Sequence, residues 1–81
     1  MKKHSLTIQG HVTSISLEDV FWEALKEEAA AQERSLASLV AEIDRARTTG
    51  LSSAIRVYLF QQVKDRAWAA TERLGSDSEA R

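Results

Sequence analysis

The stretch that decides the fold is His11-Val12-Thr13-Ser14-Ile15-Ser16-Leu17-Glu18-Asp19. Its first seven residues favour a β-strand, and the strand runs directly into a helix start. Everything after it has the spacing of helices. A lone strand cannot satisfy its own backbone N–H and C=O groups, so it needs a second strand as a partner. The sequence therefore predicts a mainly α-helical fold with one N-terminal strand, which pairs with the same strand of a second copy in a homodimer.

Two short segments of alternating polarity, residues 5–8 and 11–17, precede the helices. Their apolar residues are even-numbered in the first segment and odd-numbered in the second, so the parity changes at Gly10. An isolated glycine in a strand often marks a bulge or a bend, and we expect one here. In the second segment this alternation places three side chains on the outward side of the strand: Val12, Ser14 and Ser16.

Two helices follow the strand. The first begins near Glu18 or Asp19, where acidic residues favour the positive end of the helix dipole, and it ends near Arg34. Ser35 has the character of an N-cap for the second helix. That helix carries an apolar stripe at the spacing i, i+3, i+4, i+7, made of Leu36, Leu39, Val40 and Ile43. Gly50 is suited to the left-handed position past its end.

A third helix is expected from Leu51 to about Leu74, with Ser52 as a possible cap. It has a wide apolar surface that includes Ile55, Tyr58, Leu59, Phe60, Val63, Ala67 and Trp68. We interpret Trp22 of the first helix and Trp68 of the third as core or interface aromatics. Residues 75–81 offer nothing apolar to bury and are expected to form a disordered tail. Residues 1–74 then form a single domain.

The size and composition of the chain favour self-association and argue against an enzyme. In a chain of 81 residues one core supplies only about 3–5 kcal/mol, and the absence of cysteine removes disulfides as a further source of stability. His4 and His11 have no partners at metal-ligand spacing, so we expect no metal and no cofactor. No nucleophile elbow and no glycine-rich phosphate loop are present. The chain has no membrane-spanning run or signal peptide, which indicates a cytoplasmic protein without membrane contact.

Charge is unevenly distributed along the chain, although the net charge is only −1. Residues 18–33 hold six acids and one base, a local charge of −5, whereas residues 1–17 carry +2 and residues 51–74 also carry +2. One face of the molecule is therefore expected to be acidic and another basic. Asp44 and Arg56 form a candidate ion pair between the second and third helices, and the alternative is two independent surface charges.

The order of strand, helix, tight turn and second helix resembles the ribbon-helix-helix family of Arc-like and methionine-repressor-like proteins. The resemblance rests on residues 15–25, ISLEDVFWEAL, and on residues 34–40, RSLASLV. A longer signature, which adds residues 41–44 (AEID) and 51–57 (LSSAIRV), is similar to a bacterial, functionally uncharacterised subfamily of these proteins.

This resemblance implies a dimer whose two antiparallel strands, one per subunit, lie in the DNA major groove above four helices, with the third helix as an addition. It implies base contacts by Val12, Ser14 and Ser16 and phosphate contacts by Lys2, Lys3, Arg34, Ser35 and Ser38. It also implies a dimer core made of Ile15, Leu17, Trp22, Leu25, Leu39, Val40 and Ile43. Two serines and a valine offer no bidentate base contact, so weak sequence specificity and a steep dependence on salt are expected.

Two functions are compatible with these features. The first is a cytoplasmic, DNA-binding homodimer that acts as a transcriptional repressor or regulator. The second is a protein-interaction or assembly module that keeps the same scaffold without binding DNA. The acidic first helix and the apolar surface of the third helix favour the second function, since exposed apolar patches often mark partner sites. A protein partner would then bind through the third helix.

Overall fold

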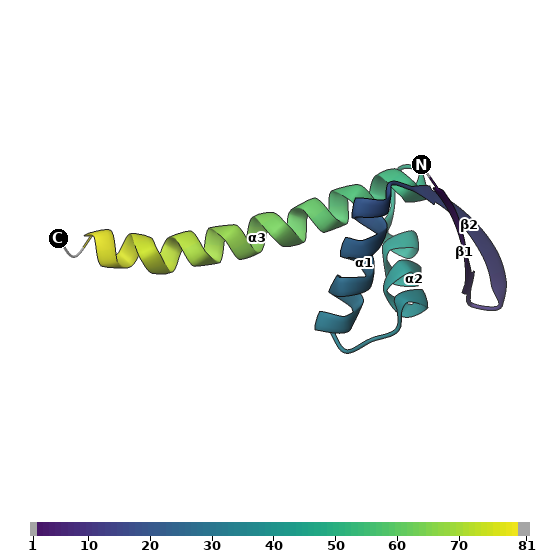
Figure 1. Cartoon of the computed structure of the whole chain (residues 1–81), viewed down its shortest axis with the longest axis horizontal. Coiled ribbons are helices and arrows are strands. Elements are labelled where there is room, and N and C mark those ends of the chain that lie inside the picture. Colours follow the sequence, from purple (N-terminus) through teal and green to yellow (C-terminus); the bar gives the residue numbers. More distant parts are fainter. Residues whose placement is uncertain (1, 80–81) are drawn as a thin grey trace.

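The computed structural model describes the backbone of residues 2–79 and the side chains of residues 2–71. It consists of a two-stranded antiparallel sheet followed by three helices (Figure 1). The elements are β1 (Lys2–Ile8), β2 (His11–Leu17), α1 (Asp19–Ala31), α2 (Leu36–Ala46) and α3 (Leu51–Glu79). The sheet stands at one end of the molecule, and α3 extends away from it beyond α1 and α2.

The N-terminal strand is not alone, which corrects the expectation of a single strand with a bulge at Gly10. β1 and β2 form a hairpin within one chain, with Ile8 opposite His11 at the turn and Lys2 opposite Leu17 at the far end. Gln9 and Gly10 have φ angles of 50° and 83°, and positive φ at both central residues is the signature of a type I′ turn. A two-residue turn places each even-numbered residue of β1 opposite an odd-numbered residue of β2. The change of the apolar residues from even to odd numbers therefore keeps them on one face of the hairpin.

One face of the hairpin packs on the helices and completes the hydrophobic core. Ile8, Ile15 and Leu17 are buried on this face, and Leu17 is fully inaccessible to solvent. The buried side chains of a strand face and of three helix stripes form one cluster, made of Ile8, Ile15, Leu17, Leu25, Ala29, Leu39, Val40, Ala41, Ile43, Ile55 and Leu59. The apolar faces predicted for the strand and the helices therefore pack together in one core.

α1 ends in a Schellman motif, which turns the chain sharply into α2. The N–H of Arg34 donates to the carbonyl of Ala29, and the N–H of Glu33 donates to the carbonyl of Ala30 (both 3.0 Å). Glu33 lies at the left-handed position of this motif with φ 53°. Ser35 then caps α2 as predicted, because its Oγ accepts a hydrogen bond from the N–H of Ser38 (3.1 Å).

Glu33→Gly is expected to stabilise the protein by about 0.5–1 kcal/mol, because glycine adopts positive φ without the steric cost of a side chain. Glu27→Gly is the matched control: the same change at an exposed position inside α1 should destabilise by about 1 kcal/mol. Chemical denaturation measures both. Equal destabilisation by the two variants would contradict the left-handed assignment of residue 33.

The connection between α2 and α3 differs from the sequence-based expectation at two residues. Gly50 does not occupy a left-handed position, because α2 ends at Arg47 in an extended conformation and Gly50 instead precedes α3, where its carbonyl accepts from the N–H of Ala54 (2.9 Å). Ser52 lies inside α3 rather than capping it. Its hydroxyl donates to the carbonyl of Ser16 (2.7 Å) and so ties the start of α3 to β2.

α3 makes the molecule elongated, with extents of 55 × 25 × 23 Å. Its 29 residues correspond to about 43 Å of helix, and α3 extends beyond α1 and α2 (Figure 1). A polar cluster fastens it to α1: the buried Glu28 carboxylate accepts from Arg66 (2.5 Å) and Gln32 (2.7 Å), and Gln32 also donates to the Tyr58 hydroxyl (2.7 Å). This cluster fixes the direction in which α3 leaves the domain.

Arg66→Met is expected to destabilise the protein by about 1–2 kcal/mol, because it leaves the Glu28 carboxylate, which is only 4% exposed, without its cation. The Arg66 side chain is 60% exposed, so solvent screens the ion pair. The expected loss of stability is therefore smaller than for an ion pair with both partners buried. Adding Glu28→Gln should recover part of the loss in denaturation experiments. Lys64→Met removes a neighbouring exposed cation and should change stability by less than about 0.5 kcal/mol.

The predicted boundary at residue 74 and the disordered tail over 75–81 stay predictions. α3 continues to Glu79, while the side chains from residue 72 onward and residues 80 and 81 lie outside the described residues. In the part of the chain that the structure describes, no helix has the length and apolar character needed to cross a membrane.

Candidate nucleic-acid interface

The outer face of the hairpin is an exposed surface of small polar side chains, and we call it the outer face throughout. Val12, Ser14 and Ser16 of β2 all lie on it, as the sequence predicted. The register places a β1 residue opposite each of them, Thr7, Ser5 and Lys3 respectively. All six side chains are exposed, and none of them is acidic.

Sequence reasoning missed the β1 half of the outer face. Ser5 and Thr7 were not expected to lie beside the predicted base-contacting residues, because residues 5–8 were not placed in the same sheet as β2. The signal that identifies them is the change of parity across Gln9 and Gly10, which places odd residues of β1 and even residues of β2 on the same face. The outer face is therefore twice as wide as the sequence indicated.

The outer edge of β2 has backbone groups available for a further strand. In an antiparallel hairpin closed by a two-residue turn, the residues of alternate pairs point their N–H and C=O groups away from the partner strand. Here those residues are Val12, Ser14 and Ser16. Ser52 donates to the Ser16 carbonyl at one end of this edge, and no other hydrogen bond from residues 2–71 reaches it.

The structure brings three predicted phosphate contacts together at the start of α2. Ser35 caps the helix, and Arg34 donates to the hydroxyl and the carbonyl of Ser38 (2.8 and 3.0 Å). Arg34 also pairs with the carboxylate of Glu42 (3.1 Å). Its guanidinium is therefore engaged within the chain, and a phosphate would compete with Glu42 for it.

Lys2 and Lys3 lie on opposite faces of β1. Lys3 belongs to the outer face, opposite Ser16. Lys2 lies opposite Leu17, and its Nζ is 4.0 Å from a carboxylate oxygen of Asp19, with both side chains largely exposed. Of these two predicted phosphate contacts, only Lys3 shares a face with the predicted base contacts.

The residues predicted to form a dimer core are mostly buried within a single chain. Ile15, Leu17, Leu25, Leu39, Val40 and Ile43 all belong to the intramolecular cluster. Trp22 is half-buried and stacks on His4, with the ring centroids 4.0 Å apart and the planes inclined by 6°. The Nε2 atom of His4 is buried and has no hydrogen-bond partner in the described structure. These side chains are therefore buried without a contribution from a second copy.

The predicted pair between Asp44 and Arg56 is wrong. Asp44 pairs with Arg47 three residues later in the chain (2.5 Å), and Arg56 pairs with Glu18 at the start of α1 (2.9 Å). The hydrogen bond from Arg56 lowers the pKa of the Glu18 carboxyl below its usual value, assisted by a backbone hydrogen bond. A lowered pKa contributes stability above the unfolded-state pKa, and this contribution is lost as the pH falls through the folded-state value.

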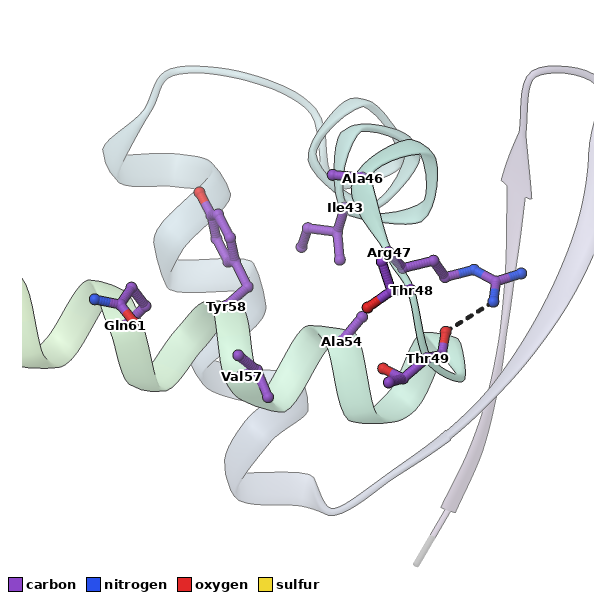
Figure 2. Close-up of a pocket in the computed structure, with 9 residues that line it drawn as sticks. All are labelled: Ile43, Ala46, Arg47, Thr48, Thr49, Ala54, Val57, Tyr58 and Gln61. Carbon is purple, nitrogen blue, oxygen red and sulfur yellow. Dashed lines mark hydrogen bonds between the residues drawn. The ribbon is translucent and has the colours of Figure 1, made fainter.

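A shallow groove of about 370 Å³ lies between the end of α2 and α3 (Figure 2). Ile43 and Ala46 of α2 line it together with Ala54, Val57 and Tyr58 of α3. Further along α3, Phe60, Val63 and Trp68 are each more than half exposed. No group of three or more His, Cys, Asp or Glu residues with metal-binding geometry occurs among the described residues.

The sequence profile described as the ribbon-helix-helix domain matches residues 1–63. The chain belongs to the ribbon-helix-helix family. The match includes both strands and all of α1 and α2, so the hairpin and its outer face are part of the family domain. Ribbon-helix-helix domains generally dimerise and bind DNA, and members of the family are usually non-enzymatic transcription regulators. No curated protein and no solved structure matched the chain.

Proposed function

We propose that this ribbon-helix-helix protein is a homodimeric, sequence-specific DNA-binding regulator of transcription, and in particular a cytoplasmic repressor of bacterial origin. The observation that carries the proposal is the outer face, an exposed surface that holds one lysine and no acidic side chain, whereas the acidic residues of the chain are concentrated in residues 18–33. Residues 18–33 carry −5, so a surface without a carboxylate is where the phosphate backbone meets least repulsion.

The dimer that we propose forms through the outer edge of β2. The available backbone groups belong to Val12, Ser14 and Ser16, and a two-fold axis at Ser14 engages all of them: Ser14 pairs with its own copy, and Val12 pairs with Ser16 of the partner subunit. Because β1 occupies the other edge of β2, the resulting sheet has the order β1-β2-β2-β1. This replaces the two-stranded ribbon expected from the sequence with a sheet of four strands.

In this dimer the two central strands enter the major groove and present Val12, Ser14 and Ser16 to the base edges. A serine hydroxyl both donates and accepts, so it contacts several bases without strong discrimination. The start of α2, with Ser35 and Ser38, supplies backbone N–H groups for a phosphate. Lys3 provides a cation on the outer face, while Lys2 and Arg34 contribute by exchanging Asp19 and Glu42 for phosphates. The dependence on salt should be steep because the binding is mostly electrostatic.

Ser16→Glu is expected to weaken binding to random-sequence duplex DNA at least about tenfold, because it places a carboxylate in the major groove, between the phosphates of its two walls. Thr71→Glu is the control, since residue 71 is exposed on α3, 19 residues beyond the contact of Ser52 with Ser16, and the same charge there should leave affinity unchanged. Fluorescence anisotropy at about 50 mM salt measures both. Failure of the parent to bind any duplex, or equal binding by the two variants, would overturn the proposal.

The second candidate function is a protein-interaction or assembly module without DNA binding. The exposed apolar side chains of α3 favour it, with Val57, Phe60 and Trp68 each about two-thirds exposed. The same measurement decides between the two candidates. A parent protein that is dimeric but binds no duplex supports the interaction module, with α3 as the surface for a protein partner.

A further inference from the structure

The outward side chains of β1 have a different composition and position from those of β2. Lys3, Ser5 and Thr7 are exposed and lie on the outer face, opposite the three β2 residues proposed to contact bases. Each carries a hydrogen-bond donor, an ammonium or a hydroxyl. The alternation of the strand directs them away from the core, so all three stay exposed.

The width of the proposed four-stranded sheet separates the positions of the two strands on DNA. Neighbouring strands lie about 4.8 Å apart, so the two central strands fit side by side in a major groove about 12 Å wide. The two outer strands are then about 14 Å apart, which exceeds the width of the groove. They must lie over its two walls, where the phosphates are.

From this placement we propose that β1 is a phosphate-binding strand, with Lys3, Ser5 and Thr7 as its contact residues; this rests on the DNA-binding function proposed above. Phosphate oxygens only accept hydrogen bonds, and all three side chains donate them. β1 then contributes affinity that is independent of sequence and fixes the dimer across the groove, while β2 alone contacts base edges.

Thr7→Lys tests this role as a gain of function in the whole 81-residue chain. The variant adds one cation per subunit, and so two per dimer, over the groove walls. The slope of log K against log salt should become steeper by about 1.8, since each neutralised phosphate contributes about 0.9. Between about 50 and 200 mM salt the variant should therefore lose roughly tenfold more affinity than the parent, on every duplex sequence alike.

Thr71→Lys is the matched control, because it makes the same substitution at an exposed residue late in α3, the helix that extends away from the sheet (Figure 1). It should leave the slope unchanged. A Thr7→Lys slope equal to that of Thr71→Lys, or a change in the preferred sequence rather than a uniform gain, overturns the role of β1 while leaving DNA binding intact. A parent that binds no duplex at any salt concentration overturns the proposed function and this inference together.

Discussion

Ile15→Asp is expected to leave the chain unfolded. Ile15 is 1% exposed and lies between the sheet and the helices, so the variant loses the transfer energy of a large aliphatic side chain, about 1.5–3 kcal/mol, and buries an unpaired carboxylate at a further cost of several kcal/mol. That sum exceeds the roughly 3–5 kcal/mol that a core of this size supplies. Circular dichroism should show loss of helix at all temperatures.

Ser5→Asp is the control for this prediction, because it introduces the same charge in the same sheet on the outer face. The variant should stay folded, with a change in stability of less than about 1 kcal/mol. The same charge then has opposite outcomes on the two faces of the hairpin, because only Ile15 contributes to the core and only there is the carboxylate buried. A folded Ile15→Asp chain, or an unfolded Ser5→Asp chain, would show that the assignment of faces is wrong.

The helices were predictable from local signals. The acidic start of α1 at Asp19 and the N-cap Ser35 each act within one turn of helix, and the structure confirms both positions. The apolar spacing of α2 likewise predicted the burial of Leu39, Val40 and Ile43, although Leu36 is only partly buried, because a helix stripe is set by the chain itself. These features need no knowledge of distant contacts.

The hairpin was misinterpreted for a specific physical reason. Glycine marks a bulge and a two-residue turn equally well, and Gln9 is not among the residues that favour positive φ, so the turn lacked its usual Asn-Gly or Asp-Gly pair. The parity change was visible in the sequence but had two explanations. The bulge and the turn are distinguished only by whether β1 pairs with β2. That pairing depends on contacts between residues distant in the chain, which local sequence signals do not show.

The ion pairs were equally beyond local reasoning. Arg56 is 38 residues from Glu18 in the chain, and the bond between them depends on how α3 crosses α1. Asp44 had a nearer cation in Arg47, three residues later, which satisfies it without any tertiary contact. For the candidate interface, the outward residues of β2 followed from alternation, but Ser5 and Thr7 required the register.

Ser14→Pro is expected to give a folded monomer that no longer binds DNA. Proline removes the N–H of residue 14, which points away from β1, so the hydrogen bonds of the hairpin remain and the core is untouched. In the proposed dimer the same N–H lies beside the two-fold axis and donates to the partner strand. Each subunit then leaves one carbonyl unpaired at about 1–3 kcal/mol, or about 2–6 kcal/mol per dimer. The dimer dissociation constant should rise at least about 30-fold, as measured by sedimentation.

Ser5→Pro separates this effect from the general cost of proline in a strand. Residue 5 lies opposite Ser14, and its N–H points away from β2 at the other side of the hairpin, where no second copy is proposed to pair. Both variants therefore remove an outward N–H from neighbouring positions of one sheet, but only Ser14→Pro should abolish dimerisation. A Ser14→Pro protein that remains a dimer would place the subunit contact elsewhere, and the exposed apolar face of α3 would then be the surface to test first. Loss of the dimer in Ser5→Pro alone would instead place the contact at the outer edge of β1.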